Sequence, residues 1–130
     1  MKKVNFFLQT FILCCMSLLF ASCFSEEDFG YPEKVPFSAE GGELVVTGET
    51  LFWYAEIQDY NGNHGRKDLS NDEMETIEFD WLRVEYKTQG TNTVKVIAMP
   101  NTTKESRNLY IKLYSGQEYA VVKVTQNKEQ

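Results

Sequence analysis

The sequence is poor in the residues that build disulfide frameworks, metal centres and catalytic triads. It has three cysteines: Cys14 and Cys15 lie in an apolar segment near the start, and Cys23 follows that segment. Histidine occurs once, at His64, so one chain cannot build a site that needs two histidines. With no Gly-x-Ser-x-Gly motif either, we predict no disulfide, no metal, no cofactor and no catalytic residue.

Basic side chains are scarce as well. The chain has 13 Lys and Arg against 19 Asp and Glu, a formal net charge of -6 that becomes -8 if Lys2 and Lys3 are removed. A chain this acidic is not held on phosphate backbones by charge, which excludes nucleic acid as a partner. The many carboxylates leave a glycoside hydrolase with two paired acids as a distant alternative, but no pair stands out.

An apolar run long enough to cross a membrane is absent. The uninterrupted apolar stretch covers only residues 11–20, after Lys2 and Lys3, and the small residues Ala21 and Ser22 follow it. A transmembrane helix needs about 20 predominantly apolar residues. The pattern is instead that of a secretory signal, which we expect to cover residues 1–22.

Cys23 and the residues after it predict a lipid anchor. The small residues before Cys23 resemble the bacterial lipobox, in which the cysteine is acylated and becomes the first residue. The acidic residues that follow, Glu26, Glu27 and Asp28, look like the export signal of surface-exposed lipoproteins of Bacteroidetes. The resemblance implies an outer-membrane protein that faces outside, held by acyl chains on Cys23. In the other interpretation these acids only solvate a flexible segment.

Strand patterns fill the remainder of the chain. We expect a lipidated acidic tether over residues 23–34 and a single domain over 35–127. Segments rich in β-branched and aromatic residues, separated by Gly, Asn, Pro or Ser, predict strands at 34–39, 42–48, 51–58, 77–86, 92–100, 107–115 and 118–126. About seven short strands in a chain of this size predict an all-β, immunoglobulin-like two-sheet sandwich.

The last two strands predict a hairpin in register detail. Gly116 and Gln117 suit a two-residue type II′ turn, which pairs Tyr114 with Tyr119. Cross-strand partners share a face. The core face is then Leu109, Ile111, Leu113, Ala120, Val122 and Val124, and the tyrosines Tyr110, Tyr114 and Tyr119 point outward.

A strip of exposed aromatic residues is the candidate binding site. On the strand 51–58 the same alternation buries Trp53, Ala55 and Ile57 and turns Phe52 and Tyr54 outward. If this strand neighbours the hairpin, Tyr54 joins the other tyrosines. The strand 77–86 leaves Trp81 outward as a further candidate. Such faces suit sugars or protein partners, although cross-strand tyrosines also simply stabilise a sheet.

Residues 59–76 are expected to form a long loop. They are rich in Asn, Gly, Asp and Ser, and include the lone histidine, which we expect to be solvated. Asp59, Asn61 and Asn63 have the spacing of the first EF-hand ligands. However, His64 and Ser70 replace the glycine and the bidentate glutamate that such a calcium loop needs.

The whole domain resembles the BACON family, the Bacteroidetes-associated carbohydrate-binding, often N-terminal domain. The resemblance covers about residues 35–126 and rests on motifs in a fixed order: Gly41, Gly42, Trp53, Asp80, Trp81, Leu82, Val84, Asn101, Arg107, Val124, Thr125 and Gln126. It implies an immunoglobulin-like sandwich and a carbohydrate role, with mucin glycans among the candidate ligands. From the residues alone, these motif positions favour structural roles: turn formation for the glycines and loop capping for Asn101.

The sequence therefore predicts a non-enzymatic outer-membrane lipoprotein that binds glycan or assists a glycan-uptake assembly. The alternative is a protein-interaction or scaffold subunit that uses the same tyrosines against a partner surface protein. Neither the glycan nor the partner follows from the residues.

Overall fold

The computed structural model of the chain describes residues 25–69 and 73–130, and the expected signal segment and Cys23 lie outside the described residues. Within these described residues, ten strands form two five-stranded sheets. The described part of the chain contains no helix of the length and apolarity that crossing a membrane requires. The strands are β1 (Ser25–Glu26), β2 (Lys34–Phe37), β3 (Gly42–Phe52), β4 (Tyr54–Gln58), β5 (Arg66–Leu69), β6 (Met74–Phe79), β7 (Leu82–Lys87), β8 (Thr91–Ala98), β9 (Arg107–Ser115) and β10 (Glu118–Gln126).

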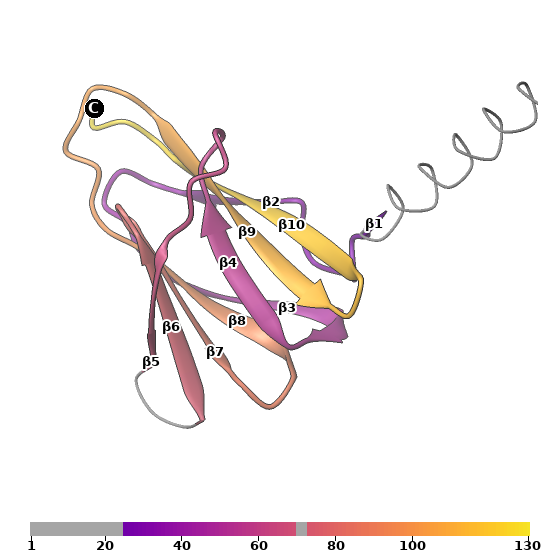
Figure 1. Cartoon of the computed structure of the whole chain (residues 1–130). Helices are drawn as coiled ribbons and strands as arrows, with labels where there is room; N and C mark the ends of the chain where they lie inside the picture. The colour runs from indigo at the N-terminus through magenta and orange to yellow at the C-terminus, as the bar shows by residue number, and fades with distance from the viewer. Residues whose placement is uncertain (1–24, 70–72) are drawn as a thin grey trace, which may run out of the picture.

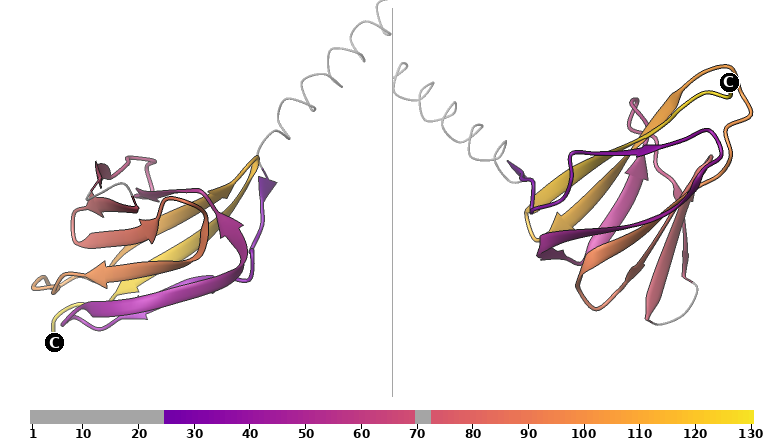
Figure 2. Two further views of the ribbon diagram at one scale, coloured as in Figure 1. Left: turned by 90° about the horizontal axis from the view of Figure 1, so that it is seen from below. Right: turned by 180° about the vertical axis from the view of Figure 1, so that it is seen from behind.

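The two sheets pack face to face as the layers of a sandwich (Figures 1 and 2). The first, here called the β10 sheet, has the order β1-β10-β9-β4, with β2 also paired to β10; the second, the β8 sheet, has the order β3-β8-β7-β6-β5. Between them lies one cluster of buried apolar side chains that extends from Phe29 to Val124. The all-β, two-sheet sandwich expected from the sequence is confirmed.

The hairpin of β9 and β10 has the predicted register. Tyr114 pairs with Tyr119, and the pairing continues without a shift along both strands. Gly116 has a φ of 62°, as the first turn position of a type II′ hairpin requires. All six residues predicted for the core face are buried: Leu109, Ile111, Leu113, Ala120, Val122 and Val124.

The side-chain alternation shifts by one residue between β3 and β4, so the predicted orientations of Phe52 and Trp53 are wrong. Phe52 is fully buried, with its ring centroid 5.3 Å from that of Tyr86, whereas Trp53 is 56% exposed. Trp53 stands at the bend where the chain leaves the β8 sheet and enters the β10 sheet. The period-two pattern of one strand therefore does not continue into the next. Ala55 and Ile57 are buried, as predicted.

The segment 77–86, predicted as one strand, forms parts of β6 and β7. Asp80 and Trp81 make the turn between them, and Asp80 has a φ of 50°. Trp81, predicted to point outward, is only 7% exposed. A turn residue does not follow the alternation of the strand after it, and the guanidinium carbon of Arg107 lies 4.8 Å from the centre of the Trp81 ring. The inner face of β7 is as predicted: Leu82, Val84 and Tyr86.

The loop predicted over residues 59–76 contains strand structure. Strand β5 and the first half of β6 fall within it, with β5 at the edge of the β8 sheet. Charged residues are typical of edge strands. Because β5 consists mostly of charged residues, it lacks the apolar alternation by which the other strands were predicted. Between β4 and β5 the chain makes a short excursion over residues 59–65, which an isolated bridge between Gln58 and His64 closes.

Residues 25–34, predicted as part of a tether, belong to the sandwich. Strand β1 pairs in parallel with β10. Phe29 and Tyr31 are buried in the core cluster, and the backbone N–H groups of Glu49 and Thr50 both donate to the carbonyl oxygen of Phe29. Two buried aromatic side chains thus fix a segment whose acidic composition predicts solvation.

The corrected orientations at the bend lead to a stability prediction. Phe52→Ala should lower the free energy of unfolding by about 3–5 kcal/mol, because it removes a fully buried ring from the core. Trp53→Ala should cost much less, since more than half of that side chain already contacts solvent. Urea unfolding followed by circular dichroism measures both. A larger loss for Trp53→Ala than for Phe52→Ala would contradict the placement.

Candidate functional site

Three tyrosine rings lie side by side across the outer face of the β10 sheet. Tyr54 pairs with Tyr114, and Tyr114 pairs with Tyr119. The ring centroids are 5.6 Å apart for the first pair and 5.8 Å for the second. We call these three residues the tyrosine row. The strand of Tyr54 does neighbour the last hairpin, which is the condition under which Tyr54 joins the other tyrosines.

Glu56 lies beside the tyrosine row and accepts hydrogen bonds from two of its three hydroxyl groups. The Tyr54 hydroxyl donates to Oε1 of Glu56 at 3.1 Å, and the Tyr114 hydroxyl donates to Oε2, also at 3.1 Å. The Gln58 amide donates to Oε2 at 2.8 Å, and Nδ1 of His64 lies 3.4 Å from the same oxygen. One carboxylate therefore gives two of the three tyrosine rings a defined orientation.

The protonation states support this arrangement. Burial alone would raise the pKa of Glu56. Hydrogen bonds from Gln58, Tyr54 and Tyr114, and then the charge of His64, outweigh burial and leave that pKa below its ordinary value. The pKa of Tyr114 is raised to about 12, first by burial and then by the charge of Glu56. At neutral pH Glu56 is therefore a carboxylate acceptor and Tyr114 a hydroxyl donor.

The other predicted site residues lie apart from the tyrosine row. Tyr110 shares the outer face of β9, but Lys112 lies between it and Tyr114 on that face, with its Nζ 5.0 Å from the centre of the Tyr119 ring. Trp81 lies in a turn of the other sheet and is buried. Cys23, the predicted lipidation site, is outside the described residues.

The excursion over residues 59–65 holds His64 beside Glu56. Oδ1 of Asp59 accepts the backbone N–H groups of Asn61 and Asn63, each at 2.9 Å, and Oδ2 accepts the Asn63 side-chain amide at 2.8 Å. The residues whose spacing resembled calcium ligands thus cap their own loop. Within residues 25–69 and 73–130, no group of three or more His, Cys, Asp or Glu side chains is placed to hold a metal ion.

A hollow of about 300 Å³ lies at the β4 end of the tyrosine row, where the edge of the β10 sheet approaches β6. Its lining combines an aromatic ring, a carboxylate, an imidazole and an apolar side chain: Tyr54, Glu56, His64, Gly65 and Ile77. Its volume falls at the lower end of the range for ligand pockets. The hollow therefore places polar groups next to Tyr54, at one end of the tyrosine row.

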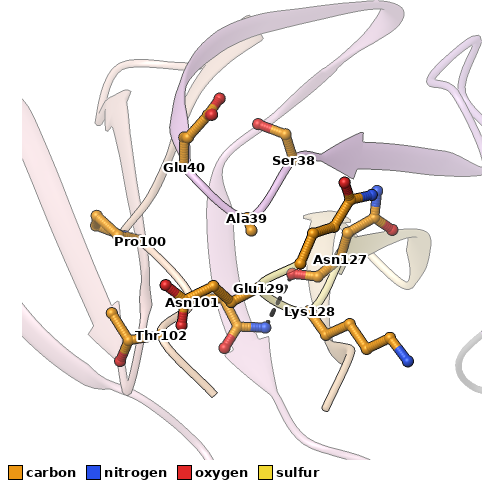
Figure 3. A pocket seen from close by; sticks show the side chains of 10 residues that line it. Ser38, Ala39, Glu40, Pro100, Asn101, Thr102, Asn127, Lys128 and Glu129 are labelled. Carbon is orange, nitrogen blue, oxygen red and sulfur yellow. Dashed lines mark hydrogen bonds between the residues drawn. The ribbon is translucent and has the colours of Figure 1, made fainter. Parts of the chain in front are cut away.

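A second hollow, of about 470 Å³, is lined in part by the last residues of the chain (Figure 3). The C-terminus lies at the end of the sandwich opposite β1 (Figure 1). The β2–β3 turn, the loop after β8 and the last residues line this hollow. Asn101, at its base, is 2% exposed. Its Nδ2 donates to the carbonyls of Glu105 and Asn127 at 2.8 and 2.9 Å, and its Oδ1 accepts the backbone N–H of Thr103 at 3.0 Å. Asn101 therefore caps its own loop, as its motif position predicts.

Sequence reasoning missed Glu56 and His64 as members of this site. Glu56 follows Tyr54 by two residues on the same face of β4, so the period-two pattern was sufficient to place it. No sequence signal places His64 there, because it returns to Glu56 only through the loop that Asp59 closes.

Comparison with known proteins finds one family whose model matches part of the domain. Residues 70–127 match the sequence model of the BACON family, described as "Putative binding domain, N-terminal". A search of curated proteins found no match. The chain is similar to a solved structure described as "NMR structure of the protein from Bacteroides thetaiotaomicron", with a TM-score of 0.56 and 20% identity over 80% of this chain and 87% of that chain. At this identity the likeness shows the fold alone.

The position of Glu56 predicts a pH dependence of stability. A folded-state pKa below the ordinary value means that the carboxylate stabilises the fold above its unfolded pKa, about 4.3, and that this contribution is lost as the pH falls through the folded pKa. Glu56→Gln should therefore be less stable than the native chain at neutral pH, and the difference should shrink in acid.

Urea unfolding over a pH series measures that difference. Glu40→Gln, in the β2–β3 turn, is the matched control for removing one carboxylate. A difference for Glu56→Gln that stays constant from neutral pH into acid would contradict the role assigned to the carboxylate.

Proposed function

We propose that this chain, whose residues 70–127 match the model of the BACON family, is a non-enzymatic lipoprotein of the outer-membrane surface that binds carbohydrate through the tyrosine row. The description of the family as a binding domain supports a binding role for this chain. In the cell, such a protein presents glycan at the surface or assists a glycan-uptake assembly.

The observation that carries the proposal is the row of adjacent rings, Tyr54, Tyr114 and Tyr119. The C–H faces of a sugar stack on aromatic rings, and its hydroxyls take hydrogen bonds from polar groups at the border. Gln58 and Lys112 supply such groups on the same outer face. Rings that Glu56 already orients lose less conformational freedom on binding, which favours affinity.

The tyrosine row is a better candidate than the hollow near the C-terminus. No aromatic side chain lines that hollow, and its polar groups come from Ser38, Glu40 and Asn101 among others. Asn101 is already committed to three backbone partners there. Of these two surfaces, the tyrosine row is the one that offers rings on which a sugar can stack.

A glycan array tests the carbohydrate proposal. The soluble chain of residues 25–130 contains the whole core cluster, so it can be used without lipid. We expect binding to a subset of mucin or polysaccharide glycans, and loss of it in the double variant Tyr114→Ala, Tyr119→Ala, because the stacking surface is removed. Tyr60→Ala is the matched control, since Tyr60 is 87% exposed and lies in the 59–65 excursion.

Circular dichroism first establishes that each variant is folded. Absence of binding to every glycan, or equal binding by the double variant, would contradict the carbohydrate proposal. Capture of one outer-membrane protein by the native chain but not by the folded double variant would instead support the alternative of a protein-interaction subunit.

Metabolic labelling tests the lipid anchor. In a bacterium that expresses the full chain, Cys23→Ser should abolish incorporation of labelled palmitate and move the protein out of the membrane fraction, because the acylated thiol is gone. Protease added to intact cells should digest the native protein, as its surface location requires. Labelled palmitate retained by Cys23→Ser would contradict the anchor.

A further inference from the structure

Exposed apolar side chains gather at the end of the sandwich where the chain enters the fold. The Ser25 N–H donates to the carbonyl of Gln117 at 3.1 Å, in the β9–β10 turn, and the Trp53 N–H donates to the carbonyl of Tyr114 at 2.9 Å, just before that turn. Trp53 is 56% exposed and Leu51 is 49% exposed. Figure 1 shows β1 at this end and the C-terminus at the other. We call this the entry end.

The chain outside the described residues ends close to the entry end. Only Phe24 separates Cys23 from Ser25, and two residue steps span at most about 7 Å. Ser25 itself is fixed, because β1 pairs with β10. A lipid on Cys23 would therefore hold the entry end against the lipid surface, without a long tether between them.

Trp53 is held in place as well as exposed. Its ring lies against Gly90 in the β7–β8 turn, where an added Cβ would come within 2.6 Å of the ring. An indole has an apolar body and one N–H donor, and tryptophan is enriched at the headgroup level of membranes for that reason. A fixed, half-exposed tryptophan beside an anchor point is the arrangement that an interfacial contact needs.

The charges at the entry end limit the kind of lipid. Glu27, Asp28, Glu49 and Glu118 line one shallow hollow there, and Glu26 lines the next. Such a cluster repels anionic headgroups. Zwitterionic headgroups carry no net charge and allow Trp53 to approach.

We propose that Trp53 and Leu51 rest in the headgroup region of a zwitterionic lipid surface when Cys23 is anchored. This inference depends on the lipid anchor in the proposed function. It gives the domain a fixed orientation, with the entry end on the lipid, the C-terminus away from it, and the tyrosine row, which crosses β4, β9 and β10 close to that end, near the headgroups.

Chemical anchoring provides the test. Cys23 is the only thiol from residue 23 onward, so the chain of residues 23–130 can be coupled to a maleimide lipid in phosphatidylcholine vesicles. Lipids brominated near the headgroup end of their acyl chains should quench the emission of Trp53. In Trp53→Phe the remaining emission comes from Trp81, which is 7% exposed and should not be quenched. Trp81→Phe is the matched control and should keep the quenching.

Emission that is equal with and without bromine in the native chain, or quenching that persists in Trp53→Phe, would overturn the inference. Quenching should be weaker in phosphatidylglycerol vesicles, and equal quenching in both lipids would overturn the choice of a zwitterionic surface. Because the anchor is attached chemically and no glycan is present, this result is independent of the palmitate and glycan-array experiments. A failure of the inference and a failure of the proposed function are therefore distinguishable.

Discussion

The bend between β3 and β4 determines where three consecutive aromatic side chains go. Phe52 enters the core, Trp53 points out at the entry end, and Tyr54 joins the tyrosine row. Tyr86 braces the bend from β7: its ring packs on Phe52, and its hydroxyl accepts the backbone N–H of Ala55 at 3.2 Å. The same hydroxyl donates to the buried carboxylate of Glu75, and burial raises the pKa of Tyr86. Tyr86 thus contacts both Phe52, at the end of β3, and the backbone of β4, the strand that carries Tyr54 of the tyrosine row.

Local patterns predicted those parts of the fold in which neighbouring residues decide the outcome. The β9–β10 hairpin is the best example, because a glycine at the turn and strict alternation together determine both its register and its faces. The inner face of β7 follows from alternation in the same way. The sandwich architecture also followed from the sequence and is confirmed, and the expected resemblance to the BACON family agrees with the match of residues 70–127 to that family's model.

The errors occur where a distant segment decides. Phe52 and Trp53 exchanged places because the chain changes sheet between them, and Trp81 is buried because Arg107, from a different strand, covers it. Phe29 and Tyr31 bring an acidic segment into the core. At the candidate site, alternation placed the tyrosines, but the contact of His64 with Glu56 depends on a loop whose path no local pattern encodes.

The tyrosine row gains its character from Glu56 more than from the rings themselves. Isolated cross-strand tyrosines stabilise a sheet by about 0.2–1 kcal/mol per pair. Here a single carboxylate fixes the hydroxyls of Tyr54 and Tyr114, so the outer ends of the rings form a surface of defined shape. Such preorganisation lowers the conformational entropy that a surface loses when it binds a ligand.

The most direct test is a nuclear Overhauser spectrum of the aromatic rings in the domain of residues 25–130, because it detects ring contacts on both sides of the bend in one experiment. The account predicts contacts between the rings of Phe52 and Tyr86 and between those of Tyr54 and Tyr114. A contact between Trp53 and Tyr86 in place of the first would mean that the alternation continues through the bend and would remove the entry-end tryptophan, and absence of the contact between Tyr54 and Tyr114 would remove the tyrosine row.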